Sequence, residues 1–230
     1  MIADNLAQVQ GRIASACAAA NRPVQSVTLL AVSKTCAAEA VRGAFAAGQR
    51  AFGENYVQEG LDKIEALADL RSQIEWHLIG PLQSNKTRAV AESFDWVHSI
   101  DRLKIAERLS AQRPAALAPL SVCIQVNVSR EASKSGVDPA DVAALAHAVS
   151  ALPGLRLRGL MAIPQVEGDF EAQRQPHVAL HELFDALRRD GLPLDTISAG
   201  MSGDLEAAIA AGATMVRVGT AIFGSRPAAV

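Results

Sequence analysis

Short apolar runs, rich in β-branched residues, alternate along the chain with longer alanine-rich segments that carry apolar residues at helical spacing. Runs of the first kind are typical of buried strands, and segments of the second kind are typical of helices that pack on one face. The predicted strands are residues 27–33, 50–53, 75–79, 96–100, 121–128, 157–163, 195–199 and 215–219. The predicted helices between them include residues 37–47, 102–111, 139–152, 175–189 and 202–211.

One more helix is predicted before the first strand, over residues 2–20, because Leu6, Val9, Ile13 and Cys17 fall on one of its faces. Repeated strand–helix units within a chain of 230 residues favour a closed (β/α)8 TIM barrel with this extra N-terminal helix. A doubly wound sheet is the alternative, but no GxGxxG follows the first strand. We therefore expect one α/β domain over residues 1–230.

Composition narrows the classes of function. Half of the residues are hydrophobic and the net charge is -2, so nothing in the charge predicts binding to nucleic acid. No apolar run is long enough to span a membrane, and the N-terminus lacks the basic segment of a signal peptide. The three cysteines are far apart, which suits a reducing, cytoplasmic compartment and predicts neither a disulfide framework nor a metal site.

Lys34 is the first candidate for chemistry. It follows the first predicted strand, at the end where barrels place their active sites. A lysine in apolar surroundings has a lowered pKa and a nucleophilic amine, which is the setting for a Schiff base. The alternative is that Lys34 points from the strand end into water. Cys36, two residues later, is either a modulator of the pocket or a small buried residue.

The loops after the last two predicted strands are candidates for an anion site. Residues 200–203, Gly-Met-Ser-Gly, follow the seventh strand, and Gly219 and Thr220 end the eighth. Barrels often bind phosphate with these two loops, through backbone N–H groups and hydroxyls. Ordinary turn and capping roles would explain either segment alone. Asp204 suits the start of a helix but would repel a phosphate if it pointed inward.

An amine near a phosphate site suits either a phosphorylated sugar held as a Schiff base or pyridoxal 5'-phosphate (PLP). Arg217 lies two residues before Gly219, so the two share a face of the last strand and Arg217 can point inward. An arginine facing the pyridine nitrogen of PLP would keep that nitrogen unprotonated and weaken the ring as an electron sink. A structural salt bridge is the alternative role for Arg217.

Six segments together resemble one known family: residues 31–35, 52–59, 76–86, 133–136, 158–164 and 215–224. In combination they are highly specific, and they resemble the pyridoxal phosphate homeostasis protein family. Members of that family are single-domain barrels related to the N-terminal domain of alanine racemase. The chain departs from the family pattern at Cys36, where a basic residue is common, and at Ala199, where a larger apolar residue is usual.

The resemblance implies a set of cofactor-binding residues in this chain: Lys34, Asn55, Met201, Ser202, Arg217, Gly219 and Thr220. Lys34 would carry PLP as an internal aldimine, Asn55 would lie near the ring, and Arg217 would face the pyridine nitrogen. Ser202, Gly219 and Thr220 would hold the phosphate. Lys134 either reaches over the mouth of the pocket or is an exposed loop lysine.

The function that the resemblance implies is storage, buffering and delivery of intracellular PLP, with no established catalytic activity and with apo PLP-dependent enzymes as acceptors. The alternatives are a PLP-dependent amino-acid enzyme, such as a weak racemase, and a Schiff-base aldolase on a phosphosugar. A racemase needs a second acid–base group, and the only tyrosine is Tyr56. His77 and His98 are candidate bases or structural groups. We expect no catalytic residue, and a monomer.

Overall fold

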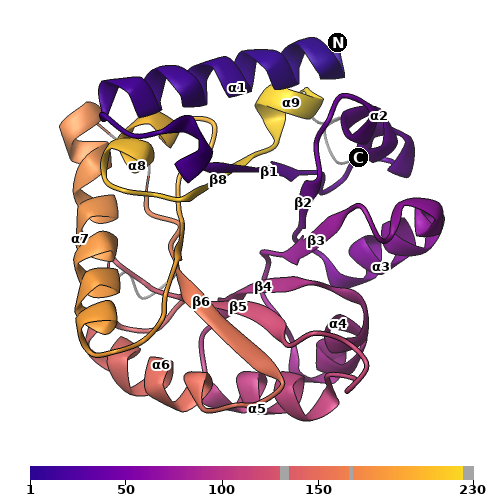
Figure 1. Cartoon of the computed structure of the whole chain (residues 1–230), viewed down its shortest axis with the longest axis vertical. Helices are drawn as coiled ribbons and strands as arrows, with labels where there is room; N and C mark the ends of the chain where they lie inside the picture. The colour runs from indigo at the N-terminus through magenta and orange to yellow at the C-terminus, as the bar shows by residue number, and fades with distance from the viewer. Residues whose placement is uncertain (130–134, 166–167, 225–230) are drawn as a thin grey trace.

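The computed structural model describes residues 1–129, 135–165 and 168–224. Parallel strands form a closed barrel in chain order, and the last strand pairs with the first. The strands are β1 (Thr28–Val32), β2 (Ala51–Glu54), β3 (Glu75–Leu78), β4 (Trp96–Ile100), β5 (Leu120–Gln125), β6 (Leu155–Met161), β7 (Thr196–Ser198) and β8 (Met215–Val218). The predicted (β/α)8 barrel is therefore confirmed (Figure 1).

Helices surround the barrel (Figure 1). They are α1 (Ile2–Ala19), α2 (Ala38–Ala46), α3 (Val57–Ala66), α4 (Thr87–Ser93), α5 (Leu103–Gln112), α6 (Val142–Ser150), α7 (Phe170–Arg189), α8 (Leu205–Ala210) and α9 (Thr220–Phe223). Short 3-10 turns occur at Val24–Ser26, Ala68–Leu70, Ser84–Lys86 and Pro139–Asp141. None of these helices is both long enough and apolar enough to span a membrane.

The extra N-terminal helix is present and lies across α8 and α9 (Figure 1). Its buried residues are Leu6, Val9, Ile13, Ala16 and Cys17, which recur at the three- and four-residue spacing of one helical face. This contact links the beginning of the chain to the segments that follow β7 and β8. The helices that follow the two predicted anion loops, α8 and α9, therefore pack against α1.

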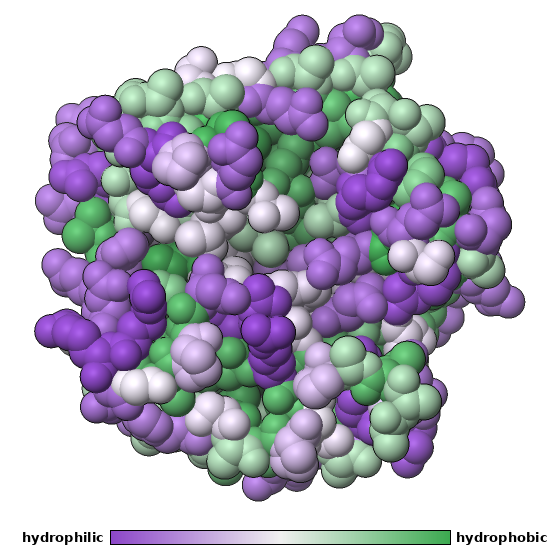
Figure 2. Space-filling model, viewed as in Figure 1, coloured by the Kyte–Doolittle hydropathy of each residue, from purple (hydrophilic) through white to green (hydrophobic). Residues whose placement is uncertain are grey.

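The interior of the barrel is partly polar. Two small apolar clusters occupy it, one around Leu30 and Met215 and one around Cys123 and Met161. Most of the apolar core lies instead between the strands and the surrounding helices. On the face shown in Figure 2, hydrophilic residues dominate the rim, and much of the hydrophobic surface lies in its recesses. The large exposed apolar side chains, such as Val24 and Leu117, come from different parts of the chain.

Some predicted boundaries differ from the structure. The helix predicted at residues 202–211 begins at Leu205, because residues 201–204 form a turn in which the Asp204 carboxylate accepts a hydrogen bond from the Met201 N–H. The helix predicted from residue 175 begins at Phe170, where the Asp169 side chain accepts a hydrogen bond from the Ala172 N–H. Such capping satisfies a backbone donor that the first helical turn leaves unpaired.

Candidate functional site

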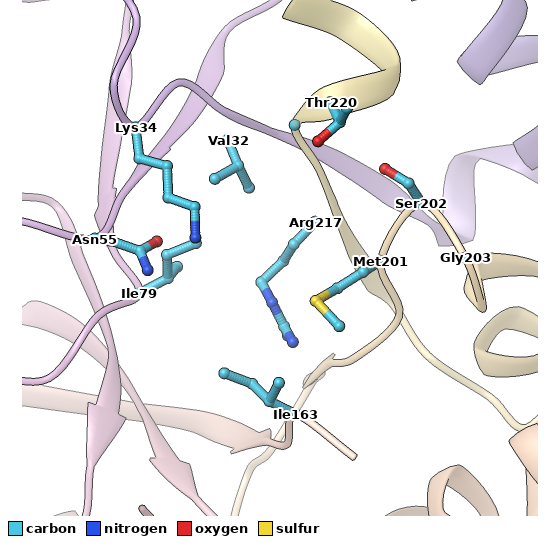
Figure 3. A pocket seen from close by; sticks show the side chains of 11 residues that line it. Val32, Lys34, Asn55, Ile79, Ile163, Met201, Ser202, Gly203, Arg217 and Thr220 are labelled. Atoms are coloured by element: carbon cyan, nitrogen blue, oxygen red, sulfur yellow. The ribbon is translucent and has the colours of Figure 1, made fainter. Parts of the chain in front are cut away.

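A cavity of about 330 Å³ opens at the carboxyl ends of the barrel strands (Figure 3). Its lining residues are Val32, Lys34, Asn55, Ile79, Ile163, Met201, Ser202, Gly203, Arg217, Gly219 and Thr220. The structure thus brings all seven predicted site residues to one cavity. This follows from the topology, because a closed parallel barrel collects the ends of distant strands at one face. Gly203 belongs to the predicted anion loop, whereas Val32, Ile79 and Ile163 were not predicted as site residues.

Lys34 stands two residues after β1 and is half-buried. Its side chain runs into the cavity beside Asn55 and Ile79 (Figure 3). Thr35 adopts a positive φ of 64°, an uncommon backbone conformation for a residue that is not glycine. The chain therefore turns sharply after Lys34, and the lysine side chain stays over the cavity while the backbone leaves toward α2.

A buried cluster of charges holds the backbone on both sides of Lys34. The Lys63 ammonium on α3 donates to the Ser33 carbonyl oxygen at 2.6 Å, to Glu54 at 2.8 Å and to Glu59 at 2.7 Å. The Ser33 hydroxyl donates to Glu54, and the Thr35 N–H donates to Glu59. Burial raises the pKa of Glu54, against the opposing effects of Lys63 and Ser33. Ser33 and Thr35, the residues on either side of Lys34, are therefore held by hydrogen bonds to this cluster.

This cluster was not predicted from the sequence, although two signals pointed to it. Glu54 is a charged residue at the end of a strand whose other positions are apolar or glycine. Glu59 and Lys63 are four residues apart on a helix, a spacing at which opposite charges meet. A charged residue in a buried strand needs a partner, since an unpaired charge is costly to bury. What the sequence did not show was that α3 supplies that partner.

Asn55 follows β2 and lies at the same side of the cavity as Lys34. Its Oδ1 atom is buried and has no hydrogen-bond partner in the described part of the chain. Gly80 packs against the Asn55 backbone so closely that a Cβ at that glycine would lie 2.0 Å from the Asn55 carbonyl oxygen. Asn55 is therefore held by its backbone while its side chain offers an unused acceptor near the cavity.

Arg217 is the buried cation of the site. It lies on β8 with only 4 % of its surface exposed, and its guanidinium donates to the Ser198 hydroxyl at 2.8 Å and to the Ala162 carbonyl oxygen at 2.9 Å. Both partners are neutral. Burial lowers the pKa of Arg217 to about 10, an effect that the negative charge of Asp204 opposes. Arg217 therefore remains charged at neutral pH and points into the cavity (Figure 3).

His77 and His98 do not reach the cavity. Both are fully buried inside the barrel, where the two rings are linked at 2.9 Å and the Nδ1 atom of His98 lies 2.8 Å from the Ser198 hydroxyl. Burial lowers the pKa of His98 well below its ordinary value, and the neighbouring His77 and Arg217 lower it further. Of the two roles considered for these histidines, candidate base or structural group, their position away from the cavity lining favours the structural one. His98 and Arg217 both contact the Ser198 hydroxyl.

The loops after β7 and β8 form the opposite side of the cavity. Gly200 has a φ of +94°, a conformation that favours glycine, and begins the turn that carries Met201, Ser202 and Gly203. Gly219 follows β8 and packs closely against β1, since a Cβ at Gly219 would lie 3.0 Å from the Val32 carbonyl oxygen. Ser202 and Thr220 present their hydroxyls toward the same region (Figure 3).

Asp204 does not face this region. Its Oδ2 atom lies 2.9 Å from His177 on α7, and its Oδ1 atom accepts from the Met201 N–H at 2.7 Å. Burial alone would raise the pKa of Asp204, but these two hydrogen bonds outweigh it and the pKa is lowered. The carboxylate is thus turned away from the cavity. The repulsion of an anion that an inward Asp204 would cause does not arise.

Two further residues were singled out in the sequence. Cys36 is half-buried, and its Sγ atom donates to the Lys34 carbonyl oxygen at 3.7 Å. Lys134 lies outside the described residues, as does Ser133 of the same segment at residues 133–136. Within the described residues, no three histidine, cysteine, aspartate or glutamate side chains are grouped so that they could hold a metal ion.

Comparison with known proteins shows which family the chain belongs to. Residues 5–227 match the family described as alanine racemase, N-terminal domain. The chain is 61 % identical over 225 residues to the pyridoxal phosphate homeostasis protein of Pseudomonas aeruginosa, covering 98 % of this chain and 96 % of that protein. The chain belongs to the pyridoxal phosphate homeostasis protein family. The member of this family from Escherichia coli K12 is 58 % identical over 230 residues, covering 98 % of this chain and 97 % of the relative.

Solved structures agree with the family. PipY of Synechococcus elongatus, solved without PLP, superimposes with a TM-score of 0.87 at 39 % identity, covering 97 % of this chain and all of PipY. PipY has also been solved with PLP bound, and that structure gives a TM-score of 0.85 at 38 % identity. Alanine racemase of Corynebacterium glutamicum, at 20 % identity and a TM-score of 0.69, shares the fold over 62 % of its own chain.

Proposed function

We propose that this chain binds PLP in the cavity above the barrel, with Lys34 as the covalent attachment point. The observation that carries the proposal is the arrangement of the lining residues: an amine on one side, hydroxyls and a glycine loop on the other, and a buried guanidinium between them. The names of its relatives, and the PLP-bound structure of PipY, support the choice of PLP over a phosphosugar.

The residues present fit the cofactor. A cavity of about 330 Å³ lies at the lower end of the range for small-molecule sites. The unpartnered Oδ1 atom of Asn55 suits a hydroxyl donor on the ring. Ser202, Gly219 and Thr220 suit a phosphate, because hydroxyls and close backbone approach are what phosphate sites use. When bound, PLP supplies an aldehyde that can condense with a lysine amine.

Arg217 favours a carrier over an enzyme. A guanidinium only donates hydrogen bonds, so a ring nitrogen that faces Arg217 must accept and stays unprotonated. PLP is then a weaker electron sink for amino-acid chemistry. Among the described residues that line the cavity, Lys34 and Arg217 are the two with side chains that ionise. Reaction on both faces of an amino acid needs two placed acid–base groups, and Arg217 is a poor one.

The biological role that we propose is homeostasis of PLP: storage, buffering and delivery to apo PLP-dependent enzymes, without catalytic activity. We further propose that residues 1–230 form one domain and that the protein acts as a monomer in the cytoplasm. The absence of disulfides among Cys17, Cys36 and Cys123 is compatible with a reducing compartment. A weak racemase remains the competing function, since it would use the same lysine.

Absorbance spectroscopy tests the binding mode. PLP is added to the parent protein, to Lys34→Ala and to a matched control, Lys104→Ala, whose lysine is exposed on α5. We expect a visible band of the protein-bound cofactor in the parent and in the control, and its loss in Lys34→Ala. Reduction with borohydride and peptide mass spectrometry then locates the modified lysine. A parent without the band, or a label elsewhere than Lys34, contradicts the proposal.

Turnover assays separate the carrier from the racemase. The PLP-loaded parent is incubated with L-alanine and D-alanine, and the enantiomers are followed by chiral chromatography. We expect no interconversion above that of Lys34→Ala, and transfer of PLP to an apo PLP-dependent enzyme that regains activity. Interconversion that depends on Lys34 would favour the racemase.

A further inference from the structure

Arg12 joins α1 to the loop after β7 across 190 positions of sequence. Its Nη2 atom donates to the Ser202 carbonyl oxygen at 3.0 Å. The same guanidinium binds Glu206 on α8 with both carboxylate oxygens, at 2.8 Å and 2.9 Å. Arg12 does not line the cavity, whereas Ser202 does. Arg12 therefore holds this loop from its outer side, where α1 crosses α8 (Figure 1).

Other contacts fix the remaining peptide groups of the loop. The Gly200 carbonyl oxygen accepts from the Arg217 N–H, and the Met201 carbonyl oxygen accepts from the Asp204 N–H. The Met201 N–H is bound by the Asp204 carboxylate, as described above. Within the part of the chain that the structure describes, the N–H groups of Ser202 and Gly203 have no such partner. These two donors border the cavity.

We propose that Arg12 is a positioning residue that orients the Ser202–Gly203 peptide for the phosphate of PLP. In a trans peptide the carbonyl and the following N–H point in opposite directions. Because Arg12 holds the Ser202 carbonyl outward, the Gly203 N–H is turned toward the cavity. Glu206 fixes the guanidinium of Arg12 in the geometry that this requires. The inference rests on the proposed binding of PLP and predicts that the site selects the phosphorylated cofactor over pyridoxal.

A purely electrostatic role for Arg12 predicts a different effect of mutation on PLP binding than a positioning role does. Arg12 carries a positive charge near the loop, but Glu206 neutralises it. If Arg12 acted only by attracting the phosphate, removing the charge of Glu206 would strengthen binding of PLP. If Arg12 acts by holding the carbonyl, removing the carboxylate frees the guanidinium and weakens binding. Glu206→Gln therefore gives opposite signs under the two mechanisms.

The experiment measures the affinities of PLP and of pyridoxal, which lacks the phosphate, for Arg12→Ala and Glu206→Gln. We expect PLP to bind about threefold to tenfold more weakly to both variants, the effect of one lost hydrogen bond, and pyridoxal to bind within about twofold of the parent. The matched controls are Arg42→Ala and Asp69→Asn, which break a similar bidentate pair that no residue of the cavity touches. Both controls should bind both ligands as the parent does.

Three outcomes overturn the inference: tighter binding of PLP by Glu206→Gln, unchanged binding by Arg12→Ala, or an equal loss for PLP and pyridoxal. Circular dichroism checks folding, and if Arg12→Ala does not fold, the sign for Glu206→Gln decides. Thermal stabilisation by inorganic phosphate gives a readout that does not need PLP. It should be smaller in Glu206→Gln than in the parent. If the parent binds phosphate in this way but not PLP, the proposed function fails while the positioning role stands.

Discussion

The two sides of the cavity are held in place by different physics. On the β1–β2 side, the backbone around Lys34 rests on Lys63 and Glu54, whose side chains are 6 % and 0 % exposed. On the β7–β8 side, the loop at Ser202 rests on Arg12 and Glu206, whose side chains are 37 % and 42 % exposed. Buried ion pairs therefore hold the first side, whereas hydrogen bonds to peptide groups and a half-exposed ion pair hold the second. The side that holds the proposed covalent bond is the more deeply anchored.

This difference predicts how each side responds to mutation. Removing one member of a buried ion pair leaves an uncompensated charge, which is among the most destabilising single changes. Removing one member of a half-exposed pair leaves a group that water can solvate. We therefore expect damage to the Lys34 side to appear mainly as lost stability. Damage to the Ser202 side should appear more as lost selectivity for the phosphate.

The largest effect is expected for Lys63→Met. The substitution removes a cation that donates to Glu54, Glu59 and the Ser33 carbonyl oxygen. It should lower the free energy of unfolding by about 3–5 kcal/mol at pH 7, measured by urea denaturation. The deficit should shrink on acidification, because Glu54, whose pKa is already raised, then protonates.

The double variant Glu54→Gln/Lys63→Met is the control for this prediction. It removes both charges together, so it should recover part of the stability that Lys63→Met loses. A loss of stability below about 1 kcal/mol in Lys63→Met would mean that the buried cluster stabilises the fold no more than an exposed ion pair does. The contrast between the two sides of the cavity would then disappear.

The next effect concerns the backbone of the β7–β8 side. Gly200 and Gly191 have nearly equal positive φ angles, +94° and +93°, but a Cβ at Gly200 would lie 2.6 Å from the Cβ of Ala208 and one at Gly191 would meet nothing within 4 Å. Gly191→Ala should cost about 1 kcal/mol, the conformational penalty alone. Gly200→Ala should cost about 3 kcal/mol, because overpacking adds to that penalty.

Thermal and urea denaturation of the two glycine variants, measured side by side, isolate the contact with Ala208. Gly200→Ala should also bind PLP more weakly, since the turn that carries Met201 and Ser202 begins there. Equal losses in the two variants would show that the turn moves freely away from α8. The loop would then not be held in one conformation.

A smaller effect should appear in the pH dependence of stability. Burial lowers the pKa of His98 well below 6.5, so between that lowered pKa and pH 6.5 the unfolded chain binds a proton that the folded chain does not. Stability must then fall as the pH falls below 6.5, by about 1.4 kcal/mol per pH unit for this group. The groups that surround His98 are His77, Ser198 and, beyond it, Arg217.

Urea denaturation between pH 7 and pH 5 checks this slope against that of His98→Gln. The variant loses stability at pH 7 with its hydrogen bonds, but its curve should be flatter by about 1.4 kcal/mol per pH unit. Parallel curves would show that His98 takes up its proton in the folded barrel at the same pH as in the unfolded chain. The conclusion that burial lowers the pKa of His98 would then be wrong.

The fold was predictable because its signal is local and repeated. Apolar runs such as residues 28–32 and 215–218 mark strands wherever they occur, and the alternation with helices favours parallel pairing. The positions of Lys34 and Arg217 at one cavity followed from the same rule, since a barrel gathers strand ends. The predicted identity of their ligand depended on a resemblance, because many ligands suit an amine near a phosphate site.

The supports of the site were not predictable in the same way. Nothing in the sequence near Ser202 indicates that Arg12, 190 residues earlier, holds its carbonyl. The pairing of Lys63 with Glu54 depends on how α3 packs on β2, which is a tertiary relation and not a periodic one. The start of α8 was misplaced because Asp204 bonds back to Met201, so residues 201–204 form a turn where helix was expected.

The smallest effect is expected for Arg42→Ala, and it completes the comparison. Arg42 binds Asp69 with two hydrogen bonds of 2.7 Å and 2.9 Å, as close as those of Lys63, but the side chains are 48 % and 58 % exposed. Urea denaturation should show little or no loss of stability, because water replaces an exposed pair at little cost. Similar distances would then give unequal energies, with burial as the cause. A loss near that of Lys63→Met would instead assign the energy to the hydrogen bonds themselves.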